Sequence, residues 1–347
     1  MIFYKTLIFL TCVLRNSNSQ ERNSTVNKNH QHLFPNLSPY PTNYFTETVN
    51  HFVNNRPIIG IVAMKMKGGK TVTEYPALKG QDYFGASFVK WVESVGGRVV
   101  PIPEDIGKFS LLKLLNKING VILPGGDGDY QRVAKIIVQY SRKQKVKKNR
   151  LFPVLGICLG AQILMKIQTT QKILKSTDSY NMDLPLIFTK HRRKSQLFGH
   201  APEDLIRVIE RKTISFNAHL NSILVSDFFR REELVKHYQI LTINRDIKGK
   251  QFISTFEDKN APIFGLQWHP EKSLFVFNPK LSINHSVYGV VVAQYIMNVF
   301  MGMARQNSNH FESYREVKNN LVYKYNHLYF GNMTDSSYEQ VYVIPPM

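Results

Sequence analysis

The sequence has few cysteines, few acidic residues and no long apolar run. Only two cysteines occur among 347 residues, which excludes a disulfide-stabilised scaffold and a cysteine-rich zinc module. No uninterrupted apolar stretch approaches the roughly 20 residues that cross a bilayer, so we expect no membrane partner. Asp and Glu number 25 against 45 Lys and Arg, for a formal charge of +20. That charge suits nucleic acid, an anionic surface or an acidic small substrate, and does not choose among them.

The first 55 residues differ in composition from the rest. Residues 1–19 combine Lys5, an apolar segment over 6–14 and small residues at 17–19, which is typical of a secretory signal peptide. A mitochondrial presequence and a retained anchor are the alternatives, but arginine is sparse and the apolar segment is too short to span. Residues 20–55 are rich in Asn, Ser, Thr and Pro without periodicity, which predicts a disordered or pro-like lead-in. We therefore expect one folded domain over 56–347.

Strand-like and helix-like patterns alternate from residue 56 onward. Short apolar runs predict buried strands, and apolar residues at helical spacing predict the helices between them. The expected strands are 57–64, 98–102, 120–123, 152–157, 239–243, 252–256 and 262–267, and the expected helices are 82–95, 109–118, 130–140, 159–167 and 287–305. Buried strands joined by helices belong to a mostly parallel sheet with helices on both faces. The sequence therefore predicts a doubly wound α/β fold.

Cys158 lies in the sequence Gly-Ile-Cys-Leu-Gly, between an expected strand and an expected helix. Glycines on both sides of a nucleophile are typical of a cramped strand-to-helix turn. At a helix N-terminus, free N–H groups and the helix dipole favour the thiolate, which is the reactive form of cysteine. Removal of the signal peptide would leave Cys158 as the single thiol. It is then either a nucleophile or a buried, inert cysteine.

The sequence Gln-Trp-His-Pro-Glu at 267–271 follows the last expected strand. In an extended segment, residues i and i+2 project to the same side, so Glu271 could orient His269. A thiol hydrolase needs a base that moves the proton and a third group that fixes the imidazole tautomer. His269 and Glu271 are therefore candidates for these two roles.

Pro124-Gly125-Gly126 closes another expected strand. Attack on an amide carbonyl creates an oxyanion, which needs unobstructed backbone N–H donors. Gly126 and Leu159, the residue after Cys158, could supply them. Taken alone, Pro-Gly-Gly is simply a turn.

Together these motifs resemble the class I glutamine amidotransferase superfamily and, within it, the gamma-glutamyl hydrolase family of folate polyglutamate hydrolases. The similarity extends over RPIIGI (56–61), ASFVKWVESVGGRVVPI (86–102), INGVILPGG (118–126), DLPLIFT (183–189), FISTFE (252–257), PIFGLQWHPEK (262–272) and the stretch at 327–332. The resemblance implies a Cys158 nucleophile, His269 as base and acid, and Glu271 as its orienter. It implies hydrolysis of gamma-glutamyl bonds in pteroyl-poly-gamma-glutamate through a thioester, without metal or cofactor, and it suggests a homodimer.

Four further residues are assigned to substrate binding from a looser resemblance. Lys194 occupies the place of a histidine in the family, and Asn217-Ala218-His219 resembles the family's Asn-containing substrate loop only in part. Gln162 is more typical of the amidotransferases than of the folate hydrolases. These departures affect the substrate more than the catalytic unit.

Two basic segments, 142–150 and 190–194, could attract a polyglutamate tail, or they could be a solvated helix end and a solvated loop. Segment 142–150 should enter the nucleophile strand from its amino end. A secretory route, to lysosome, vacuole or exterior, argues against nucleic acid as the partner. The alternatives to a folate hydrolase are a hydrolase of another gamma-glutamyl amine, a glutaminase of the same superfamily, and a non-enzymatic secreted binding protein.

Overall fold

The computed structural model describes residues 38–42, 54–68, 70–331 and 337–345. The expected signal peptide lies outside these residues, as does most of the expected lead-in. The described lead-in residues, however, lie against the folded domain. The backbone N–H of Thr42 donates to the carbonyl of His200 at 2.8 Å, and that of Asn54 donates to the carbonyl of Arg305 at 2.9 Å. Thr42 and Asn54 therefore contact the folded domain.

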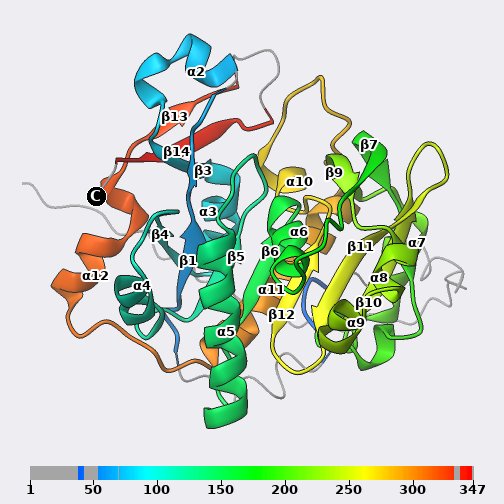
Figure 1. Cartoon of the computed structure of the whole chain (residues 1–347), viewed down its shortest axis with the longest axis horizontal. Coiled ribbons are helices and arrows are strands. Elements are labelled where there is room, and N and C mark those ends of the chain that lie inside the picture. Colours follow the sequence, from blue (N-terminus) through cyan, green and yellow to red (C-terminus); the bar gives the residue numbers. More distant parts are fainter. Residues whose placement is uncertain (1–37, 43–53, 69, 332–336, 346–347) are drawn as a thin grey trace, which may run out of the picture. The chain divides into compact units, whose positions relative to one another are not determined.

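An eight-stranded sheet forms the centre of this domain, in the order β4-β1-β5-β6-β12-β11-β10-β8 (Figure 1). The five strands from β4 to β12 run parallel, and β11, β10 and β8 follow in antiparallel pairing. The parallel strands are buried almost throughout because helices cover both faces, which explains their continuous apolar runs. The bounds are β1 (Ile58–Val62), β4 (Arg98–Ile102), β5 (Gly120–Leu123), β6 (Val154–Ile157), β8 (Ile187–Phe188), β10 (Tyr238–Arg245), β11 (Gln251–Asp258) and β12 (Ile263–Leu266).

Helices pack on both faces of this sheet and divide the core in two. One face is covered by α3 (Ala86–Glu93), α7 (Glu203–Arg211) and α11 (Val287–Arg305), which bury Trp91 and Tyr295. The other face is covered by α4 (Lys108–Leu115), α5 (Gln131–Lys148) and α6 (Leu159–Lys166), which bury Tyr130 and Phe152. The predicted doubly wound α/β fold is thus confirmed (Figure 1).

Two smaller sheets accompany the central one. The strands β7 (Lys175–Leu184) and β9 (Ser215–Ser222) pair antiparallel, and a four-stranded sheet has the order β13-β14-β3-β2. The prediction of a helix over residues 82–85 is wrong, because they form β3 and pair with 341–344 of β14. The remaining bounds are β2 (Met64–Lys65), β3 (Asp82–Gly85), β13 (His327–Tyr329), β14 (Gln340–Ile344), α2 (Lys70–Glu74), α8 (Val225–Phe229), α9 (Glu232–His237), α10 (Lys272–Phe275) and α12 (Tyr314–Asn320).

The helix α11 is long and apolar enough, by length and composition alone, to cross a membrane. The sequence predicts no such segment, because polar residues interrupt the apolar run. In the structure, 67% of the apolar window is buried inside the protein. Its side chains pack against the sheet and α3 as part of the core.

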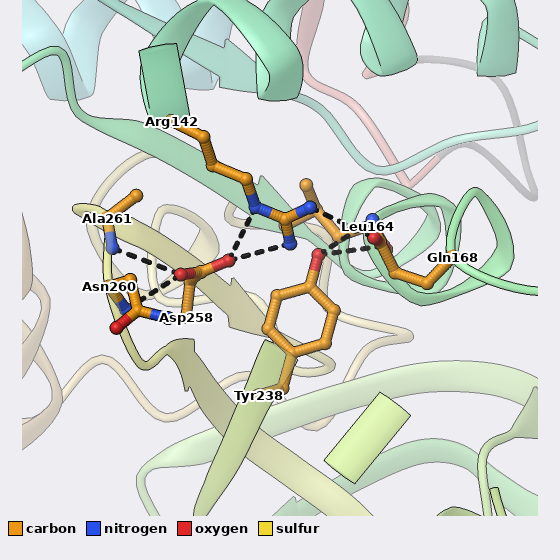
Figure 2. Close-up of polar contacts among 7 residues, drawn as sticks. All are labelled: Arg142, Leu164, Gln168, Tyr238, Asp258, Asn260 and Ala261. Carbon is orange, nitrogen blue, oxygen red and sulfur yellow. Dashed lines mark hydrogen bonds and ion pairs between the residues drawn. The ribbon is translucent and has the colours of Figure 1, made fainter. Parts of the chain in front are cut away.

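The basic segment 142–150 lies at the amino end of β6, as the sequence predicts, and its first residue has a structural partner. Nε and Nη2 of Arg142 donate to Oδ2 of Asp258 at 2.9 and 2.7 Å (Figure 2). The Asp258 side chain is buried, and its Oδ1 accepts the backbone N–H groups of Asn260 and Ala261. Arg142 therefore joins α5 to the end of β11, on the side of the sheet away from the carboxyl ends of the parallel strands.

Candidate active site

Cys158 occupies the turn between β6 and α6. Its backbone has φ 49° and ψ −103°, a conformation that is uncommon for a residue with a side chain. The turn leaves no room beside it, since a Cβ on Gly160 would lie 2.0 Å from the carbonyl oxygen of Leu123, and one on Gly156 would lie 2.7 Å from Gly160. The Cys158 side chain is 8% exposed at the N-terminus of α6. The predicted strand-to-helix turn is confirmed.

His269 and Glu271 form a buried pair after β12. Nδ1 of His269 lies 2.8 Å from Oε1 of Glu271, and the imidazole and Cys158 both lie against Gly125. The predicted reason for the pairing is wrong, because residues 270–271 form a turn that leads into α10 rather than an extended segment. The structure nevertheless brings sulfur, imidazole and carboxylate together in the order that a thiol hydrolase requires.

The charge state of His269 follows from its surroundings. Burial alone would lower the pKa of this imidazole, but the Glu271 carboxylate and the Cys158 sulfur outweigh burial and raise the pKa to about 9. The imidazole therefore carries a proton at neutral pH. An imidazolium beside a cysteine favours the nucleophilic thiolate.

Two glutamine amides form a chain that ends at the sulfur. Nε2 of Gln267 donates to Sγ of Cys158 at 3.6 Å, while Oε1 of Gln267 accepts from Nε2 of Gln162 at 3.2 Å. Nε2 of Gln162 also donates to the carbonyl of Asn221 at 2.9 Å. Gln162 thus reaches the site through Gln267 and fixes the direction of its amide. Gln267 is not among the residues predicted for the site, although it stands in the same motif as His269.

The glycines after β5 lie directly beside the catalytic side chains. A Cβ on Gly125 would lie 2.6 Å from Cε1 of His269 and 3.1 Å from Cβ of Cys158. Gly126 has φ +145°, which favours glycine, and Leu159 is the first residue of α6. The first N–H groups of a helix have no partner within the helix, so the Leu159 N–H is available to a ligand. Leu159 therefore follows Cys158 in the chain, and Gly126 follows Gly125, the glycine that lies against Cys158.

Asn217 and His219 belong to a buried network on β9. Burial lowers the pKa of His219 to about 3, and the charge of His269 acts in the same direction. The neutral ring donates from Nε2 to Oδ1 of Asn217 at 3.1 Å and accepts at Nδ1 from Ser222 at 2.9 Å. His219 is therefore uncharged beside the site.

Within the described part of the chain, no group of three or more His, Cys, Asp or Glu residues could hold a metal ion.

Two residues that sequence reasoning missed reach the site from α10 and from the C-terminal segment. Oη of Tyr338 donates to the carbonyl oxygen of Gly125 at 3.3 Å. The buried Lys272 donates from Nζ to the carbonyl of Ser337, and its ammonium lies 5.2 Å from the centre of the Tyr338 ring. No motif marks Tyr338, because only the pairing of β14 with β3 brings it here.

Lys194 is not brought to Cys158. The strand β8 runs antiparallel to β10, so the chain leaves β8 toward the amino ends of the parallel strands. It then continues to Gln196, whose N–H donates to Oε2 of the buried Glu257 at 3.0 Å. Lys194 therefore follows the edge strand, and β10, β11 and β12 lie between β8 and β6. Of the two alternatives for segment 190–194, the direction of β8 favours the solvated loop.

Comparison with known proteins gives concordant results. The model of the glutamine amidotransferase class-I family matches residues 84–287. The gamma-glutamyl hydrolase of Mus musculus is 38% identical over 295 residues, which cover 84% of this chain and 90% of the mouse protein. That of Homo sapiens is 36% identical, covering 83% and 89%, and gamma-glutamyl hydrolase B of Dictyostelium discoideum is 30% identical, covering 84% of each. The region that the family model matches includes every residue of the site except Tyr338 and Ser337.

Proposed function

The chain belongs to the gamma-glutamyl hydrolase family, within the class I glutamine amidotransferases, and from this premise we propose that it hydrolyses gamma-glutamyl amide bonds of pteroyl-poly-gamma-glutamate. The observation that carries the proposal is the buried unit of Cys158, His269 and Glu271, with Nδ1 and Oε1 2.8 Å apart. It contains a nucleophile, a proton carrier and an orienting carboxylate in one place.

In the first step, the Cys158 thiolate attacks the gamma-carbonyl carbon. The carbonyl oxygen becomes an oxyanion, which the N–H groups of Gly126 and Leu159 stabilise. His269 enters this step protonated, in keeping with its raised pKa. It gives its proton to the departing alpha-amino group as the carbon–nitrogen bond breaks, and a thioester to Cys158 remains.

In the second step, the imidazole is neutral and accepts a proton from water. The resulting hydroxide attacks the thioester carbonyl, the same two N–H groups hold the new oxyanion, and the carbon–sulfur bond breaks. The sulfur leaves as thiolate and His269 regains its proton. Glu271 stabilises the imidazolium and keeps its Nδ1 proton in place throughout.

The other polar residues of the site support this unit. Gln162 orients Gln267, whose amide N–H₂ faces the sulfur. The neutral His219 and Asn217 stiffen β9, whose Phe216 carbonyl accepts the backbone N–H of His269 at 2.9 Å. We assign Asn217 and His219 to the wall of the substrate site, and no role there to Lys194.

The remaining expectations concern location and assembly. Residues 1–19 act as a secretory signal peptide, and the mature enzyme resides in the lysosome, the vacuole or the exterior. Residues 20–55 precede the catalytic domain at 56–347, and the enzyme is a homodimer. Secretion from a eukaryotic host tests entry into the secretory pathway, N-terminal sequencing tests removal of residues 1–19, and light scattering tests the homodimer. A mature chain that still begins at Met1 would contradict the first.

The activity is tested by incubating the purified protein with pteroyl-oligoglutamate, with a gamma-glutamyl amine and with glutamine. Products are resolved by mass. We expect shortened pteroyl-glutamates and free glutamate or glutamyl peptides. Ammonia released from glutamine alone would favour the glutaminase, cleavage of the amine alone would favour the other hydrolase, and no product from any substrate would favour a binding protein.

The Cys158→Ala variant is the matched control. Turnover should vanish, whereas the melting temperature should stay within a few degrees, because the thiol is small and the turn keeps a side chain. Peptide mapping after iodoacetamide should show that inactivation of the parent follows alkylation of Cys158. Full activity in the alanine variant would refute the thiol mechanism.

A further inference from the structure

The segment before β14 carries an aromatic side chain into the active site. The Tyr338 ring occupies the space that a side chain on Gly85 would need, since a Cβ there would lie 2.7 Å from ring Cδ1. It also packs edge-on against Tyr83, with ring centres 6.3 Å apart. Residues 341–344 pair with β3 and anchor this segment. Packing and strand pairing therefore hold the Tyr338 ring in position.

The hydroxyl of this ring reaches the peptide between the two glycines after β5. Oη of Tyr338 donates to the Gly125 carbonyl at 3.3 Å, and a Cβ on Gly126 would lie 3.0 Å from Oη. In a trans peptide, the carbonyl and the following N–H point in opposite directions. A hydrogen bond to the Gly125 carbonyl therefore also fixes the direction of the Gly126 N–H. Glycines on both sides restrict this peptide little, so an external contact is needed to hold it.

Lys272 connects this contact to the catalytic carboxylate. It follows Glu271 directly, its side chain is buried, and its ammonium holds the Ser337 carbonyl next to the Tyr338 ring. An ammonium over the face of a tyrosine ring is an attractive arrangement. The turn that carries His269 and Glu271 is thus tied to the segment that carries Tyr338.

We propose that Tyr338 is a positioning residue of the active site, whose hydroxyl holds the Gly125–Gly126 peptide so that the Gly126 N–H is ready for the oxyanion. The proposal rests on the proposed function, since the oxyanion arises in amide hydrolysis. The oxyanion forms only after attack, so the hydroxyl acts on the transition state and not on substrate binding. Its loss should lower kcat and leave KM unchanged.

The test replaces Tyr338 with Phe, which removes the hydroxyl and keeps the ring. Removal of one oxyanion donor costs about 10²–10³ in rate, and loss of a group that only orients the donor should cost less, about 10-fold in kcat. KM should stay within about twofold. The matched control is Tyr342→Phe, on the strand β14 that follows, whose ring packs against Phe84 with centres 6.0 Å apart. It should keep the parent kcat.

A second measurement separates positioning from a structural role. Alkylation of Cys158 by iodoacetamide needs the thiolate but forms no oxyanion, so its rate should be the same in Tyr338→Phe and the parent. At equal folded fraction by circular dichroism, the ratio of kcat to the alkylation rate should therefore fall about 10-fold. An unchanged ratio, or a higher KM at constant kcat, would overturn the proposal. If the parent cleaves no gamma-glutamyl substrate, the proposed function itself fails; an active parent with an equally active Tyr338→Phe variant refutes only the role of Tyr338.

Discussion

Gly125 approaches His269 so closely that a Cβ on the glycine would lie 2.6 Å from Cε1 of the imidazole. The same Cβ would lie 3.1 Å from Cβ of Cys158. Contacts below 3.0 Å do not occur between such atoms, so a side chain at this position must displace the ring. The absence of a side chain at Gly125 is therefore a condition for the contact between His269 and Cys158.

The variant Gly125→Ala tests this relationship. A displacement of about 1 Å at a catalytic group can cost 10²-fold in rate, and we expect kcat/KM to fall at least that far. The matched control is Gly107→Ala at the start of α4, where φ is −62° and a Cβ would meet nothing within 4 Å. Steady-state kinetics on both variants, at equal folded fraction by circular dichroism, decides the matter. Parent-like turnover in Gly125→Ala would show that the site tolerates the methyl group.

The pH dependence of kcat/KM in Glu271→Gln follows from the protonation state of His269. The protonated imidazole supplies a proton to the leaving amine, so kcat/KM of the parent should fall as the pH rises through the His269 pKa, which is about 9. The Glu271 carboxylate raises this pKa, so replacing it with a neutral amide should lower the pKa. The descending limb should move to lower pH. A limb that stays near pH 9 in the variant would assign it to another group.

Replacement of His269 and of Glu271 should lower kcat/KM by different amounts. His269→Ala should be nearly as damaging as Cys158→Ala, because the members of a catalytic unit act together and their effects do not add. Glu271→Gln should be milder, since it keeps the shape and loses only the charge. Comparison of kcat/KM among the three variants checks the ranking. A larger defect in Glu271→Gln than in His269→Ala would reverse the assigned roles.

The parallel half of the fold could be predicted because each of its strands is buried on both sides. Residues 98–102 and 120–123 read as continuous apolar runs and form β4 and β5 with the expected bounds. The helix over 287–305 also has its expected bounds. The turn at Cys158 was predictable because two glycines flank a nucleophile at a strand end, and each glycine proves sterically necessary.

The errors arise where distant segments decide the local structure. Phe84 shares helical spacing with Phe88, so periodicity extended α3 back to residue 82, whereas pairing with β14 makes 82–85 a strand. Lys194 is assigned because it occupies the place of a histidine in the family, and the direction of β8 cannot be read from a two-residue strand. Tyr338 carries no local signal, since its place in the site depends on the pairing of β14 with β3.

Arg142→Gln should destabilise the protein without changing catalysis. The variant leaves Asp258, which is 1% exposed, without its guanidinium partner (Figure 2). Loss of one partner from a buried pair costs about 3 kcal/mol, and we expect a loss of that order in the free energy of unfolding. Lys143 lies in the same segment but is exposed, so Lys143→Gln should change the free energy of unfolding by less than about 0.5 kcal/mol. Denaturant unfolding and kcat/KM together check this, and a stable but inactive Arg142→Gln would instead place the residue near substrate.

Segment 190–194 is basic, and the sequence leaves open whether its charge attracts a polyglutamate tail or lies in a solvated loop. The structure places it after the edge strand β8, where Arg192 pairs with Glu203 at 3.1 Å. Exposed charges are screened within about 8 Å at physiological ionic strength, so charges beyond three intervening strands should not sense the substrate. Replacement of Lys190, Arg192, Arg193 and Lys194 by Gln should therefore leave the ratio of KM values for a long chain and a diglutamate unchanged, with or without added salt. If KM for the long chain rises more than KM for the diglutamate, the tail passes over this segment, and its path must turn around the edge of the sheet.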